Sequence, residues 1–236
     1  MKNTNSIWPK MFLFVPVLMI FSCIKNDNFI KGDAKIRYFH SAVTDTIQNF
    51  YLRGIQSGAS TAYGSNSNYI VVAGDSSYTI TSRNINTATD VASTTNKFDI
   101  GANYSIFYTR KTATSKPELT VFKDDVKQNL DSVKLTFLNL GYTLNSNVIV
   151  KDDGGAFPQF TMKYGDRFSH TIKLTKATRI SFALEAPIAT QPAVNALDSL
   201  PTTTSKSIAI TKGLVYTVLL DGTKKNELQM RLVSTN

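Results

Sequence analysis

Hydrophobic and polar residues alternate along two separate stretches of the chain. In residues 34–41 (AKIRYFHS) the alternate positions Ile36, Tyr38 and His40 share one face, and residues 133–140 (VKLTFLNL) repeat the pattern. Successive side chains of a β-strand point to opposite faces, so a period of two is typical of a strand. Each stretch therefore predicts a strand that directs one face into a core.

Further segments rich in Val, Ile, Thr, Tyr and Phe predict about seven short strands in each half of the chain, separated by turns containing Gly, Asp and Asn. The remaining expected strands are residues 49–53, 69–73, 77–82, 97–100, 103–110 and 118–123 in the first half, and 146–151, 168–174, 178–185, 206–211, 214–221 and 227–233 in the second. No stretch shows an apolar stripe at helical spacing, so we expect an all-β protein.

The two halves carry the same landmarks in the same order. The pairs are Tyr63-Gly64 with Tyr164-Gly165, and residues 101–108 (GANYSIFY) with residues 213–220 (GLVYTVLL). Repeated landmarks in constant order indicate a duplicated unit. We expect two tandem β-sandwich modules of immunoglobulin-like size, over residues 34–125 and 130–236. The pattern does not determine the strand order within a module.

The first residues of the chain are typical of a secretory signal. An apolar run over residues 11–21 follows a polar stretch that carries two lysines and no acid. As a helix this run would span about 16 Å, against a hydrocarbon core of about 30 Å, so it is too short for a membrane anchor. The run ends in Ile20-Phe21-Ser22-Cys23, which resembles the lipobox of bacterial lipoproteins.

A lipobox implies a lipid-anchored protein. Residues 1–22 would be removed, Cys23 would carry the lipid, and residues 23–33 would form a tether; the alternative is a signal cleaved elsewhere, with Cys23 incidental. Two or more acyl chains hold a protein firmly at a membrane. Because Ile24 rather than Asp follows the cysteine, the resemblance implies the outer membrane, on its periplasmic or its surface face.

Charge and composition narrow the classes of partner. The chain is 42% hydrophobic and 18% charged, which is typical of a globular protein. Two lysines precede Cys23, so 24 basic and 17 acidic residues remain after it, a net charge of +7. The basic residues are scattered and form no stripe with aromatic residues, which argues against nucleic-acid binding. One Cys and two His give no basis for a metal site, and we expect no cofactor.

His40 is the most catalytic-looking residue, since Ser41 follows it directly and Asp45 lies nearby. A Ser-His-Asp device needs three converging side chains, whereas neighbours on a strand point to opposite faces. His40 also corresponds to Asn139 in the second half, and Asn cannot act as a base. We therefore predict that His40 binds turn backbone at a strand end, that no residue is catalytic, and that the protein is not an enzyme.

Tyrosines near predicted turns are the candidate binding residues. Tyr51, Tyr63 and Tyr142 each combine an apolar ring with a polar hydroxyl, as many recognition surfaces do. A second candidate surface is the polar segment between matching strands, over residues 83–97 in the first half and 185–206 in the second. Long loops are commonly functional; the alternative is a tolerated surface excursion.

Several landmarks together resemble one protein family. They are a first strand that ends in His40-Ser41, a Tyr-Gly step, and Gly-x-x-Tyr-(Ser/Thr) beginning at Gly101 and Gly213. Over about residues 34–236 this set resembles the bacterial domain of unknown function 4397, from which Asn139-Leu140 departs. The resemblance implies a β-rich extracytoplasmic module, often in tandem and in lipoproteins of Bacteroidetes-type bacteria. It implies no reaction.

These observations support three functional hypotheses of different classes. The first is a lipid-anchored, non-enzymatic binding or adhesion protein of the cell envelope or cell surface, which contacts a glycan or a protein. The alternative is a structural or assembly subunit of an envelope complex. The third, an envelope hydrolase, lacks a recognisable catalytic motif.

Overall fold

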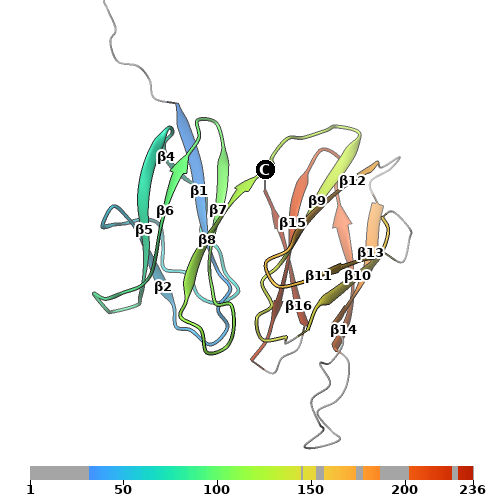
Figure 1. Ribbon diagram of the computed structural model, residues 1–236. Coiled ribbons are helices and arrows are strands. Elements are labelled where there is room, and N and C mark those ends of the chain that lie inside the picture. Colours follow the sequence, from blue (N-terminus) through green and yellow to red (C-terminus); the bar gives the residue numbers. More distant parts are fainter. Residues whose placement is uncertain are drawn as a thin grey trace, which may run out of the picture. The chain divides into compact units, whose positions relative to one another are not determined.

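The computed structural model describes residues 32–144, 146–152, 157–173, 178–186, 202–224 and 228–235. Within these ranges the protein consists of sixteen strands in four four-stranded sheets, with no helix (Figure 1). No helix that could cross a membrane occurs among these residues. The expected all-β class, built from tandem β-sandwich modules, is confirmed.

The first module contains strands β1 to β8. Their bounds are β1 Asp33–His40, β2 Gln48–Leu52, β3 Ile55–Gln56, β4 Ile70–Ala73, β5 Ser76–Asn84, β6 Asp90–Phe98, β7 Asn103–Thr109 and β8 Glu118–Asp124. One sheet has the order β4-β1-β7-β8 and the other β3-β2-β5-β6. Strands β1 and β7 are parallel, and the other pairs are antiparallel.

The second module contains strands β9 to β16. Their bounds are β9 Ser132–Asn139, β10 Val148–Asp152, β11 Phe160–Met162, β12 Arg167–Lys173, β13 Thr178–Ala186, β14 Thr202–Ile210, β15 Val215–Gly222 and β16 Leu228–Ser234. Its sheets have the orders β12-β9-β15-β16 and β11-β10-β13-β14, and β9 is parallel to β15. Each strand of the first module therefore has a counterpart in the second, as a duplicated unit would have.

Each module has its own apolar core between its two sheets. In the first, Ile36 and Tyr38 from β1 are completely buried, and the Tyr38 ring stacks on Phe50 with centroids 4.3 Å apart. In the second, Leu135 and Phe137 from β9 take the corresponding places. Full burial of one such side chain stabilises the fold by about 1.5–3 kcal/mol, so these inward positions fix the register of the two central strands.

The outer face of β1 is also buried, contrary to the expectation of one inward face. Arg37 is 3% exposed and Phe39 is 1% exposed. Phe39 and Phe107 form one cluster with Leu138 and Leu219, which lie on β9 and β15 of the other module. The sheets β4-β1-β7-β8 and β12-β9-β15-β16 thus pack against each other through their outer faces.

Most of the polar segment 83–97 belongs to strands and does not form the expected long loop. Only residues 85–89 separate β5 from β6, and β6 then pairs with β5 along its length. Ala92 and Phe98 point into the core from this edge strand, while its solvent-facing positions carry Ser, Thr and Lys. In the second module, residues 187–201 lie outside the described residues, as do Cys23 and the residues before it.

Candidate functional site

The predicted binding residue Tyr63 contacts the other module. Its hydroxyl donates towards the carbonyl oxygen of Gly222 at 2.9 Å and the side-chain oxygen of Gln229 at 2.7 Å. Burial is the main cause that raises the pKa of Tyr63. Its counterpart Tyr164 lies 3.3 Å from the hydroxyl of Thr109, again across the module boundary. This Tyr-Gly landmark therefore serves the contact between the modules.

Tyr51 and Tyr142 lie in different surroundings. Tyr142 is only 6% exposed, and its hydroxyl lies 3.2 Å from that of Thr44, so its ring offers no stacking surface. Tyr51 is half-buried on β2, where the Arg83 guanidinium lies 4.1 Å from the centre of its ring. The structure does not bring the three candidate tyrosines into one site. A binding role for Tyr51 stays a prediction.

Among the described contacts, no hydrogen bond joins the side chains of His40, Ser41 and Asp45 to one another. His40 Nε2 lies 2.8 Å from the carbonyl oxygen of Thr46, which only accepts, so this nitrogen carries the proton. The Ser41 hydroxyl instead accepts from Arg231 at 3.2 Å. Burial lowers the pKa of His40. The contact with Thr46 has the form expected of a structural residue that binds loop backbone.

Asn139 performs a similar task at the matching strand end. Its amide nitrogen donates to the carbonyl oxygen of Met162 at 3.2 Å, and its oxygen accepts from the Gly141 backbone at 2.9 Å. Both residues are buried at the end of a central strand. His40 and Asn139 therefore both bind nearby loop backbone through hydrogen bonds at corresponding strand ends.

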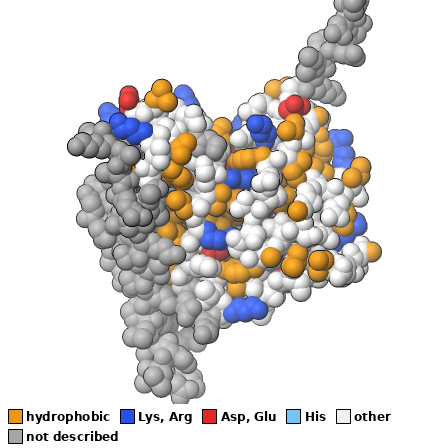
Figure 2. Space-filling model, turned by 180° about the vertical axis from the view of Figure 1, so that it is seen from behind, with side chains coloured by type: hydrophobic (Ala, Val, Ile, Leu, Met, Phe, Trp, Pro, Cys, Tyr) orange, Lys and Arg blue, Asp and Glu red, His pale blue; other side chains and the backbone are white. Residues whose placement is uncertain are grey.

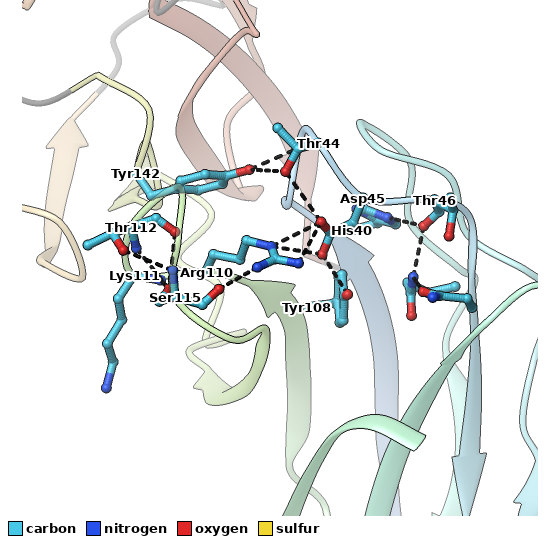
Figure 3. A network of polar contacts seen from close by, with 12 residues as sticks. His40, Thr44, Asp45, Thr46, Tyr108, Arg110, Lys111, Thr112, Ser115 and Tyr142 are labelled. Carbon is cyan, nitrogen blue, oxygen red and sulfur yellow. Dashed lines mark hydrogen bonds and ion pairs between the residues drawn. The ribbon is translucent and has the colours of Figure 1, made fainter. Parts of the chain in front are cut away.

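Asp45 organises a polar network at one end of the first module (Figure 3). Its carboxylate accepts from Arg110 Nε at 2.9 and 3.0 Å and from the Tyr108 hydroxyl at 2.6 Å. Arg110 also donates to the carbonyl oxygen of Ser115. Burial, together with the Asp45 carboxylate, raises the pKa of Tyr108.

This network borders a hollow of about 370 Å³. Asp45 is hydrogen-bonded to Arg110 and Tyr108, and Arg110 is also bonded to the backbone of Ser115. These bonds hold the loops together and leave few hydrogen-bonding groups available to a ligand. We therefore interpret this end of the module as a structural clamp.

A larger open groove, of about 660 Å³, lies where β7 begins and β8 ends, beside the segment after β8 and the first residues of β12. The residues that line it are Ile100, Gly101, Ala102, Asn103, Lys123, Asp124, Asp125, Val126, Lys127, Arg167 and Ser169. They supply hydroxyl, amide, carboxylate, ammonium and guanidinium groups. Ile100 adds an apolar side chain that is 55% exposed. Both modules contribute walls to this groove.

The two carboxylates of the groove already have partners. Buried Asp124 accepts from the Ser105 hydroxyl at 2.8 Å and the Tyr69 hydroxyl at 3.0 Å, and it lies 4.0 Å from the Arg37 guanidinium. Burial raises the pKa of Asp124, and Arg37 opposes that rise. Asp125 pairs with Lys134, whose hydrogen bond is the main cause that lowers the pKa of Asp125.

The cations of the groove are more numerous than its acids. Lys123 is 2.8 Å from Asp99, outside the groove, and its carbonyl oxygen accepts from Arg167 Nη1 at 2.9 Å. Asp99, Asp124 and Asp125 are paired with Lys123, Arg37 and Lys134, and the charge of Arg167 also lowers the pKa of Asp124 and Asp125. With Arg167 and Lys127 included, five cations stand against these three acids. The groove therefore presents a positive charge together with many hydrogen-bonding groups.

The comparisons with known proteins add structural resemblances to solved chains. No protein-family model matches this chain, and no curated protein matches it. A solved structure that it resembles is the carbohydrate-binding module CBMbc, of family CBM26, from Eubacterium rectale Amy13K, in complex with maltoheptaose. The two chains are 10% identical, the match covers 86% of this chain and 97% of that one, and the TM-score is 0.26. The fold described above therefore stands on the sheets of this chain alone.

Sequence reasoning did not find this groove. Its key residues Asn103, Lys127 and Arg167 lie far apart in the chain and form no motif. On the face that Figure 2 shows, Lys and Arg side chains are scattered, so charge clustering gives no signal there either. Among the described residues, no three His, Cys, Asp or Glu side chains are grouped to hold a metal ion.

Proposed function

We propose that this protein is a non-enzymatic glycan-binding protein of the bacterial cell envelope, and that the groove beside β7, β8 and β12 is its binding site. The observation that carries the proposal is the groove itself, with a volume of about 660 Å³. Ligand sites commonly have volumes of about 300–1,000 Å³ and a few well-placed polar groups.

The chemistry of the lining suits a sugar. Sugar hydroxyls both donate and accept hydrogen bonds, and the groove offers donors on Asn103 and Arg167 and acceptors on Asp125. The exposed Ile100 supplies an apolar surface for the carbon–hydrogen face of a sugar ring. Arg167 and Ser169 are held by β12, whose pairing with β9 fixes their positions.

Attachment to a membrane through a lipid on Cys23 completes the proposal. Its support is the lipobox-like sequence before the only cysteine of the chain. An outer-membrane location and a relationship to domain of unknown function 4397 rest on the same kind of sequence resemblance. In this account the lipid holds the protein at the membrane, while the groove binds envelope or surface glycan.

A second candidate, an assembly subunit, is favoured by the edge of β6. Strand β6 is nine residues long, and among the described residues it pairs only with β5. An unpaired edge can add a strand from another chain. Concentration-dependent dimers, abolished by Thr95→Pro on β6 and retained in a glycan-binding variant, would support this second function.

The direct test of the proposal blocks the groove. Ser169→Trp places a large side chain in it, while Thr171→Trp, at another exposed position of β12, is the matched control because Thr171 does not line the groove. The unaltered chain is first screened on a glycan array, and the bound glycan is then titrated by calorimetry. We expect Ser169→Trp to lose binding and Thr171→Trp to retain it. Equal binding by both variants, or no bound glycan at all, would contradict the proposal.

A further inference from the structure

We infer that the glycan bound in the groove is an anionic polysaccharide, whose carboxylate or sulfate groups pair with Arg167 and Lys127. This inference rests on the proposed function and names the class of ligand. Its basis is the surplus of positive charge at a groove whose carboxylates are already paired. An anionic ligand would neutralise that surplus.

Arg167 is positioned to recognise an anion. It begins the regular edge strand β12, opposite Leu138 of β9, and its Nη1 is held by the carbonyl oxygen of Lys123 at 2.9 Å. Its guanidinium carbon also lies 5.8 Å from the centre of the Phe122 ring. A guanidinium has five donors in a fixed plane and binds a carboxylate or sulfate through two parallel hydrogen bonds. The bond to Lys123 uses only part of this capacity.

Lys127 brings a second cation from a different segment. It lies between β8 and β9, is exposed, and lines the same groove as Arg167. Its backbone nitrogen donates to the Asp125 carboxylate at 3.2 Å, which orients the turn that carries it. An ammonium on a flexible stem adds attraction without strict geometry, so Lys127 can pair with an anionic group near the one that Arg167 holds.

The shape and the acids of the groove distinguish an acidic sugar from a membrane surface. A lipid surface is flat and meets protruding basic residues, whereas these two cations line a hollow. The exposed carboxylate of Asp125 would repel a purely anionic surface, but it can accept hydrogen bonds from the hydroxyls of a sugar. A ligand with both hydroxyls and separate negative groups satisfies both features.

The test compares four probes by calorimetry and sedimentation with the purified chain. They are polygalacturonate, which carries carboxylates; dextran sulfate, which carries sulfates; neutral dextran; and vesicles containing phosphatidylglycerol. We expect at least one of the two anionic polysaccharides to bind about tenfold or more tightly than dextran. The affinity should fall as salt is raised, because ion pairs are screened.

Three charge-neutralising variants locate the binding. Arg167→Gln and Lys127→Gln should each weaken binding of the anionic polysaccharide about tenfold. Lys173→Gln is the matched control, since Lys173 is an exposed cation on β12 that does not line the groove. Arg167→Gln also loses a hydrogen bond, so its melting temperature is measured. Lys127 has no described side-chain bond, and its variant reports on binding alone.

Each contrary result points to a different conclusion. If dextran binds as tightly as the anionic polysaccharides, or if all three variants weaken binding equally, the inference is overturned while glycan binding stands. Binding to the vesicles alone would assign the charge to a membrane surface and overturn the inference. If no polysaccharide binds and the glycan array is also blank, the proposed function itself fails.

Discussion

Tyr63 and Tyr164 occupy matching positions in the two modules, and each places its hydroxyl against the opposite module. Tyr63 reaches the carbonyl oxygen of Gly222, and Tyr164 reaches the hydroxyl of Thr109. An apolar cluster also joins the two modules, and it contains Phe107 on β7 and Leu219 on β15. These two residues occupy corresponding positions in the two modules. The contact between the modules is therefore made by corresponding surfaces of both copies.

The first prediction concerns these two hydroxyls. Tyr63→Phe should lower the free energy of unfolding by about 1–3 kcal/mol, because it leaves part-buried acceptors without their donor. Tyr164→Phe, which loses a single longer contact, should cost about 0.5–1.5 kcal/mol. Tyr51→Phe, which lies away from the module contact, should change the free energy of unfolding by less than about 0.5 kcal/mol. Urea unfolding measures the free energy of unfolding of all three variants. Equal decreases in the three would show that the two hydroxyls at the module contact add no stability beyond that of an ordinary surface tyrosine.

The second prediction concerns the apolar part of the same contact. Leu219 is completely buried in the cluster with Phe39 and Phe107, so Leu219→Ala should cost about 2–5 kcal/mol. Leu130→Ala is the matched control, because Leu130 is 81% exposed and should cost almost nothing. Thermal and urea unfolding provide the measurement. A Leu219→Ala protein as stable as its control would mean that the two outer sheet faces do not pack together in solution.

Much of this fold could be predicted from the order of residues, and the exceptions have physical causes. Alternation located β1 correctly, but it could not show that Arg37 and Phe39 on its outer face are covered, because that depends on a second sheet. The Thr-rich sequence of β6 predicts a polar loop, whereas the structure has a strand there, because an edge strand needs few apolar residues. The groove could not be found, because Asn103 and Arg167 meet only through the tertiary fold.

The third prediction concerns acid stability. Burial lowers the pKa of His40 below its usual 6.5, so the unfolded chain binds this proton more tightly than the folded one. Stability should be complete above pH 6.5 and fall as the pH drops below it, by at most about 1.4 kcal/mol per pH unit for one group. His40→Asn, which copies the residue of the second module, should flatten this slope.

Urea unfolding at several values between pH 8 and 5 provides the measurement for His40. The pH dependence that remains in His40→Asn should come from His170, whose pKa burial also lowers, and from Asp124 and Asp221, whose pKa values burial raises. The two aspartates act in the opposite direction, because the folded chain binds their protons more tightly than the unfolded chain. An unchanged slope in His40→Asn would assign the acid sensitivity to other groups.

The fourth prediction concerns membrane attachment. In the bacterium, Cys23→Ala should abolish fatty-acid labelling and release the protein from the membrane fraction, because the lipobox-like sequence offers no other thiol. Cell fractionation and metabolic labelling with a palmitate analogue provide the readout. A variant that stays labelled and membrane-bound would show that Cys23 is not the lipidated residue.

The central claim is that the groove binds a glycan, and an NMR titration tests it most directly. A backbone-assigned sample is titrated with the best-binding polysaccharide fragment from the array. We predict that amide signals of Asn103, Lys127, Arg167 and Ser169 shift together and saturate at one ligand concentration, while those around Tyr51 stay in place. Shifts centred on the Tyr51 face or on the Asp45 network, with the groove signals unmoved, would contradict the account.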